Sequence, residues 1–173
     1  MRRILSNCGQ TLMLLGLFWT ACIALGADRP AVRVEPSDSV GPRAVEAQTR
    51  SSVVRDYVSA WKGMSRALEK NNASLLDVDF LGTAKDKLAD TVQDQRKLGL
   101  TTRYEDRKHN IAFAFYSPEG MSIQLVDSVE YDVQLLDHGQ VIVKRHVRTR
   151  YLAVLTPTEV RWKVRIFQAL PPQ

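Results

Sequence analysis

Strict alternation of side chains between Met121 and Leu135 constrains the fold of this chain more than any other feature. Every second residue of this stretch is apolar, apart from one acid: Met121, Ile123, Leu125, Asp127, Val129, Tyr131, Val133 and Leu135. Such a row predicts a long strand with one face turned to a core or cavity. An ionised carboxylate on that face is costly unless it is paired, so Asp127 requires a partner or a function.

The N-terminal residues have the layout of a secretory signal peptide. Arg2 and Arg3 precede an apolar run from Thr11 to Leu25, and small residues surround the expected cleavage after Gly26. We therefore expect an exported protein, periplasmic or extracellular, although an uncleaved membrane anchor and a lipoprotein attached through Cys22 stay open. Cleavage would remove both cysteines, which excludes disulfides and thiol catalysis from the mature chain.

The next segment, residues 27–48, carries three prolines, scattered charges and only isolated valines. It cannot bury enough apolar surface to offset its ordering entropy, so we interpret it as a disordered tether. The remainder, residues 49–173, is long enough for one domain with a core of its own.

Removal of residues 1–26 takes away two arginines and no acid, which lowers the net charge from +5 to +3. This mild charge does not indicate nucleic-acid binding.

Two amphipathic helices are predicted before a series of strands. Apolar residues recur at spacings of three and four from Ser51 to Lys70, where Thr49 or Ser51 can cap the start, and a second helix is expected near Thr83 to Leu98, ended by Gly99. Three turn signals then divide the rest into four antiparallel strands: residues 118–120, 137–139 and 156–159. The fold class is therefore α+β, with N-terminal helices packed on a curved four-stranded meander.

These turns also predict a register. Ile111 should lie opposite Asp127, Phe115 opposite Ile123, and Asp127 opposite Thr149 on the next strand. In the last hairpin, Ala153 should lie opposite Trp162.

Several motifs resemble those of the nuclear-transport-factor-2-like superfamily, which has the SnoaL-like cone fold. They are Gly99-Leu100, the segment from Ser117 to Gly120, Leu135-Leu136-Asp137, and the closing segment from Arg161 to Val164. The order of elements from Ser51 to Gln168 is also similar to the inter-membrane domains of plastid division proteins and their bacterial relatives. The resemblance implies a cone with a pocket between helices and sheet. The superfamily contains ketosteroid isomerase and scytalone dehydratase as well as non-catalytic modules, and no catalytic motif of those enzymes matches residue by residue.

The predicted register gathers polar side chains on the inner face around Asp127, with His109 as the second candidate catalytic residue. A carboxylate beside an imidazole can raise its basicity and produce a general base. A structural network is the plainer interpretation, and a single β-bulge would dissolve the cluster. The expected ligand pocket has this lining: Trp61, Phe113, Tyr131, Arg145, Thr149 and Tyr151.

Basic residues alternate on the opposite face of the last two strands, namely Lys144, Arg148 and Arg150, followed by Arg161, Lys163 and Arg165. This face would suit an anionic surface, although cross-strand ion pairs or a homodimer through the sheet would also account for it. The three histidines lack metal-ligand spacing, so we expect no metal and no cofactor.

These features favour a non-catalytic binding or assembly module of the cell envelope, whose partner is a small apolar ligand, an envelope protein or an anionic surface. The alternative is a small pocket enzyme, of isomerase, dehydratase or hydrolase type, that uses Asp127 and His109.

Overall fold

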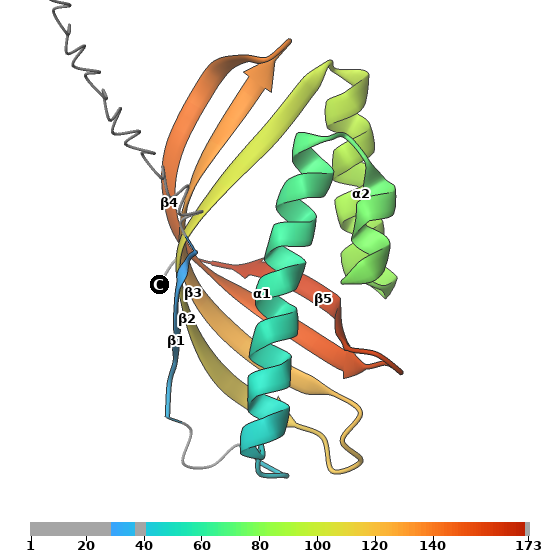
Figure 1. Ribbon diagram of the computed structural model, residues 1–173, viewed down its shortest axis with the longest axis vertical. Helices are drawn as coiled ribbons and strands as arrows, with labels where there is room; N and C mark the ends of the chain where they lie inside the picture. Colours follow the sequence, from blue (N-terminus) through green and yellow to red (C-terminus); the bar gives the residue numbers. More distant parts are fainter. Residues whose placement is uncertain (1–28, 37–40, 172–173) are drawn as a thin grey trace, which may run out of the picture.

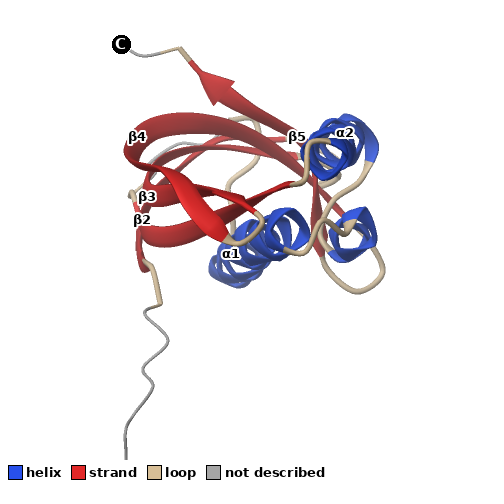
Figure 2. Cartoon of the chain, turned by 90° about the horizontal axis from the view of Figure 1, so that it is seen from above, coloured by secondary structure: helices blue, strands red, loops and turns tan. Residues whose placement is uncertain are grey.

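The computed structural model describes residues 29–36 and 41–171. The predicted signal peptide and both cysteines lie outside these residues. Helices α1 and α2 and the short 3-10 helix η1 cover one face of a strongly curved five-stranded sheet (Figure 1). Seen from above, the helices and the sheet form two layers (Figure 2). The elements are β1 Ala31–Val34, α1 Ala47–Glu69, η1 Ala73–Val78, α2 Gly82–Lys97, β2 Leu100–Tyr116, β3 Ile123–Asp137, β4 Gln140–Pro157 and β5 Trp162–Leu170.

The α+β class and both helices are confirmed. Helix α1 nevertheless starts before the predicted caps Thr49 and Ser51. Glu46 occupies the N-cap position, and its side chain makes no capping hydrogen bond. At the other end, Asn71 adopts φ 49° and Gly99 after α2 adopts φ 70°, so both helices stop at residues that tolerate the left-handed conformation.

The sheet has five strands and not the four that were predicted, and the additional strand also contradicts part of the tether prediction. Strand β1 lies within the segment interpreted as a tether and pairs in parallel with β2, Ala31 opposite Lys108 and Val34 opposite Ile111. The tether prediction is wrong for these four residues, and also for Ala47 and Gln48, which begin α1. Isolated valines are sufficient here because the edge of β2 supplies the backbone partners and Val34 packs against the core.

Pairing of β2 with β3 is confirmed near Asp127, which lies opposite Ile111. Closer to the turn, a bulge shifts the register, so Tyr116 and not Phe115 lies opposite Ile123. Phe115 is therefore 38% exposed, whereas Tyr116 is buried.

Between β3 and β4 the predicted register is wrong by two residues. The turn is one residue tighter, with Asp137 opposite Gln140, and a bulge follows between Leu135 and Leu136. As a result, Asp127 lies opposite Tyr151 and not Thr149. Two single-residue shifts restore the alternation, so the side chains keep their predicted faces.

The β4–β5 hairpin departs further from the prediction. Pro157 pairs with Trp162, and a bulge between Val154 and Leu155 then places Phe167 opposite Ala153. The predicted pair of Ala153 with Trp162 is wrong. Phe167 consequently faces the helices, where its ring stacks on Tyr151 with a centroid distance of 4.6 Å.

Candidate functional site

The carboxylate of Asp127 lies fully buried at the centre of β3 and receives three polar contacts. Tyr57 on α1 donates its hydroxyl to Oδ2 at 3.1 Å, His109 Nδ1 lies 2.6 Å from the same oxygen, and the Asn110 backbone N–H donates to Oδ1 at 3.1 Å. The structure thus brings the two candidate catalytic residues together. It also supplies the partners that a buried carboxylate requires.

His109 lies between two carboxylates. Asp127 contacts its Nδ1, while its Nε2 lies 3.9 Å from Asp106 Oδ2, which is too long for a hydrogen bond. Within the described residues, neither His109 Nε2 nor the buried Asp106 Oδ1 has a hydrogen-bond partner. Such unsatisfied buried atoms are uncommon and require an explanation.

A β-bulge in β2 produces this arrangement. The register shifts between Asp106 and Lys108, so Arg107 is an extra residue, and Asp106 and His109 face inward although they are three apart. The Arg107 guanidinium bonds Asp132 instead. Sequence reasoning missed Asp106 because no glycine or proline marks the bulge.

Protonation of His109 follows from these neighbours. Burial alone lowers its pKa, but the Asp106 and Asp127 carboxylates outweigh burial and raise the pKa from 6.5 to about 9. His109 is therefore an imidazolium at neutral pH, with the Asp127 side chain against its Nδ1. Burial and the nearby Asp127 raise the pKa of Tyr57 well above 10, so its phenol stays a donor. A general base at neutral pH would need a free imidazole instead.

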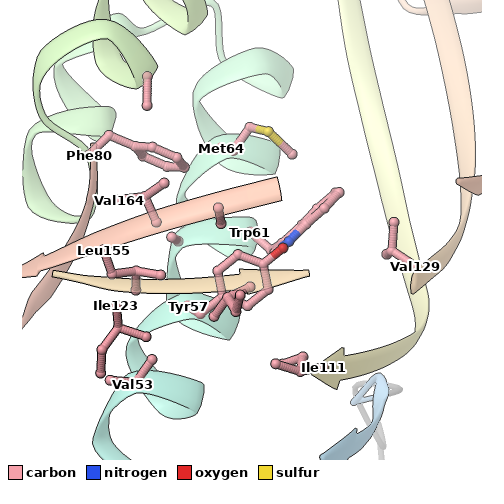
Figure 3. Close-up of a cluster of buried hydrophobic side chains, with 14 of the residues drawn as sticks. Val53, Tyr57, Trp61, Met64, Phe80, Ile111, Ile123, Val129, Leu155 and Val164 are labelled. Carbon is pink, nitrogen blue, oxygen red and sulfur yellow. The ribbon is translucent and has the colours of Figure 1, made fainter. Parts of the chain in front are cut away.

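Tyr57 and Trp61 lie one turn apart on α1 and belong to the buried cluster of Figure 3. Tyr57 donates to Asp127 and the Trp61 ring packs beside His109, so the two residues cover the pair. The Trp61 ring is 1% exposed, and its centroid lies 5.4 Å from that of His109. Tyr57 lies within the helix predicted from Ser51 to Lys70, but no polar role was predicted for it. Its hydroxyl was the available signal, because a buried tyrosine oxygen needs a partner.

Aromatic rings occupy the space that was expected to form the ligand pocket. Trp61 contacts Tyr131 and Tyr151 at centroid distances of 5.8 and 5.2 Å, and Phe167 at 5.3 Å. Phe113 is buried as well, with the guanidinium of Arg50 5.7 Å from its ring. These predicted pocket residues therefore belong to the packed core.

The other two predicted pocket residues lie away from Asp127. Thr149 pairs with Val129, one inward-facing position along the sheet, and Arg145 is exposed opposite Val133. The two-residue register shift described above moved both of them.

The six predicted basic residues do not share one surface. Arg161 forms an ion pair with the buried Asp79 at 2.6 Å, and Lys163 donates to the Asp77 carbonyl at 2.7 Å. Both side chains thereby connect β5 to the segment around η1 and do not join the patch on β4. The remaining four are Lys144, Arg148, Arg150 and Arg165. Of these, Arg148 forms an ion pair with Glu130 at 3.3 Å.

A groove of about 540 Å³ runs along α1 beside β2, and Asp106 forms part of its wall together with Lys62 and Arg66. The described residues contain no group of three or more potential metal ligands. His138 and His146 instead contact acids on their own hairpin. In this part of the chain, no helix has the length and apolarity of a membrane span.

No protein family and no curated protein matches the sequence. Among solved structures, the chain is similar to the intermembrane space region of the chloroplast protein ARC6, with a TM-score of 0.60 and 18% identity over 76% of this chain and 100% of that one. An NTF2-like family protein from Streptomyces avermitilis has a TM-score of 0.49 and 11% identity over 71% of this chain and 99% of that one. A proposed scytalone dehydratase from Novosphingobium aromaticivorans has a TM-score of 0.48 and 13% identity over 73% of this chain and 89% of that one.

The two-layer arrangement of helices over a curved meander agrees with the likeness to the ARC6 region. The element order is β1, α1, η1, α2 and then the meander β2 to β5. The chain therefore has the fold of this ARC6 region, the NTF2-like fold.

Proposed function

We propose that this chain is a non-catalytic binding or assembly module that works outside the cytoplasm. One observation carries the proposal: His109 and Asp127 have no exposed surface, and Tyr57 and Trp61 cover them. A catalytic group must reach its substrate. The buried ion pair instead fixes α1 against β2 and β3.

The location outside the cytoplasm has two supports. The first is the signal-peptide layout of residues 1–26. The second is the likeness to a domain of ARC6 that lies in an intermembrane space. The proposal includes a location in the periplasm or outside the cell, with attachment to a membrane as one form of it.

A pocket enzyme is the second candidate, favoured by one specific observation. His109 Nε2 and Asp106 Oδ1 are buried without hydrogen-bond partners, and Asp106 borders the groove beside α1. Movement of α1 would expose an imidazolium N–H that could protonate a substrate. This alternative requires the interior to open.

Fluorescence quenching separates the two candidates. The chain has three tryptophans, so a Trp19→Phe/Trp162→Phe variant retains Trp61 as the only reporter of the interior. We expect acrylamide to quench Trp61 far less than free tryptophan. The matched Trp19→Phe/Trp61→Phe variant retains the half-buried Trp162 and should be quenched more. Quenching of Trp61 as efficient as that of Trp162 would support the enzyme.

Export is tested separately by cell fractionation and N-terminal sequencing. Recovery from the envelope or the medium with Ala27 as the first residue would support cleavage after Gly26. Recovery from the cytoplasm with an intact N-terminus would contradict it.

A further inference from the structure

The outer face of the sheet, opposite the helices, carries a groove of about 450 Å³. Its volume falls within the roughly 300–1,000 Å³ of small-molecule sites. Residues from β2, β3, β4 and the end of β5 line it: Lys108, Asn110, Ser128, Val129, Glu130, Arg148, Thr149, Arg150, Leu170 and Pro171.

Strand register organises the polar residues of the groove into two rows. One row crosses the sheet as Lys108, Glu130 and Arg148. The second row is longer and reads Arg33, Asn110, Ser128, Arg150 and Leu170 from β1 to β5. Neighbouring members of a row lie about 5 Å apart, so several side chains can reach one ligand.

Positive charge exceeds negative charge in these rows. Among the described residues, Arg33, Lys108 and Arg150 form no ion pair. The Glu130 carboxylate is shared by Arg148 at 3.3 Å and His146 at 3.2 Å. Glu35, just after β1, accepts from the Asn110 amide. Asp132, the next outward-facing residue after Glu130 on β3, is paired with Arg107 and His146. An anion therefore meets cations that no carboxylate of the groove neutralises.

Ser128 marks the centre of the groove, between Asn110 and Arg150. Its exposed hydroxyl has no hydrogen-bond partner among the described residues. A phosphate or carboxylate placed above it can accept from this hydroxyl and from the Arg150 guanidinium, whose fork suits two oxygens.

Apolar surface adjoins this charged centre. Leu170 and Pro171 form one wall of the groove. On the other side of Ser128, the next outward-facing row consists of Ala112, Val126 and Leu152, all half-buried. A ligand with an anionic head and an apolar body would match both parts.

We propose that this groove binds an anionic amphiphile, a phosphate or carboxylate head joined to an apolar chain. The head lies at Ser128 and Arg150, with Lys108 across the groove, and the chain lies against Leu170 and Pro171. The inference deepens the proposed binding role and rests on it. A free amphiphile and a lipid headgroup in a membrane share this chemistry.

Calorimetric and NMR titrations of the full chain with hexyl phosphate test the proposal. We expect saturable binding, weakened by salt, with amide shifts concentrated at Asn110, Ser128 and Arg150. Hexanol and inorganic phosphate each lack one half of the ligand and should bind at least about tenfold more weakly. A tenfold loss corresponds to one missing interaction of ordinary strength.

Charge-reversal variants locate the site. Lys108→Glu and Arg150→Glu should each weaken binding about tenfold or more. Arg165→Glu makes the same change in net charge at an exposed position outside the groove and should leave binding unchanged. Thermal melting of each variant shows that it is folded. Equal loss in all three variants would indicate a diffuse charge effect and overturn the proposal.

Vesicles distinguish the two sources of the ligand. Binding to phosphatidylglycerol vesicles and not to phosphatidylcholine vesicles, together with hexyl phosphate binding, identifies a membrane lipid. Hexyl phosphate binding without vesicle binding identifies a free amphiphile. Absence of binding to both hexyl phosphate and vesicles would overturn the groove proposal. The proposed function would still stand if Trp61 is quenched as weakly as expected. A readily quenched Trp61 would instead reject the proposed function.

Discussion

On the inner face of the sheet, the charges of His109 and Asp127 are enclosed and held by fixed partners, whereas on the outer face Lys108 and Arg150 lie beside an open groove without an ion-pair partner among the described residues. Both regions lie on the same sheet, and on β2 the outward-facing Lys108 directly precedes the inward-facing His109. The difference shows that a polar residue on an apolar face can serve the fold. The freer cations across the sheet are better placed to bind something.

The largest effect should come from Trp61→Ala, which removes the ring that fills the interior. Truncation of a buried tryptophan costs about 3–5 kcal/mol, so the free energy of unfolding should fall by this amount in urea titrations. Trp162→Ala is the control, since that ring is only half-buried, and should cost less. A loss below about 1 kcal/mol at Trp61 would mean that the interior is hydrated.

Replacement of His109 by glutamine should have the next largest effect at pH 7. It removes the charged partner of Asp127 and leaves a buried carboxylate with two neutral donors, a change that costs about 3–5 kcal/mol. His109→Gln/Asp127→Asn removes both charges and should cost less than the sum of the single variants. Additive losses would show that the two residues do not interact.

The raised pKa of His109 predicts a pH dependence of stability. A group with a folded pKa near 9 and an unfolded pKa of 6.5 stabilises the fold fully below pH 6.5, and this contribution is lost as the pH rises through about 9. The difference corresponds to about 3 kcal/mol. Denaturation at a series of pH values should show this decline in the wild type and not in His109→Gln. A flat profile in the wild type would place His109 in a different environment.

A smaller loss is expected for Tyr57→Phe. The variant keeps the ring and removes one hydrogen bond to Asp127, which costs about 1–2 kcal/mol. Tyr116→Phe is a matched control, because Tyr116 is also a core tyrosine and its hydroxyl forms no hydrogen bond within the described structure, so the change in stability should stay below about 0.5 kcal/mol. Equal effects of the two variants would contradict the role of Tyr57.

The smallest effect on stability should come from the outer groove. Arg150→Ala removes a half-buried cation without an ion pair and should change the free energy of unfolding by less than about 0.5 kcal/mol. Chemical denaturation beside His109→Gln compares the two faces directly. A loss above about 1 kcal/mol would show that the outer cations stabilise the fold as well.

Apolar spacings of three and four were sufficient to predict the helices, and alternation with turn chemistry was sufficient to predict the meander and the burial of Asp127. They could not locate the bulges at Arg107 and Arg165, because bulges depend on how strands curve over the helices. Asp106 and Phe167 were therefore missed. The His109–Asp127 contact was predictable, since the inward-facing row of β3 lies opposite that of β2. A closed interior was not, because Trp61 fills it only through its position on α1.

Hydrogen exchange of the histidine ring protons, followed by ¹⁵N NMR, tests the central claim most directly. We expect both ring N–H signals of His109 to persist at pH 7 and exchange slowly, with a pKa near 9 that falls in Asp127→Asn. His138 provides an internal standard, because its side chain is 86% exposed and its ring protons should exchange too fast to observe. Ring protons of His109 that exchange as fast as those of His138 would show an open interior and contradict the account.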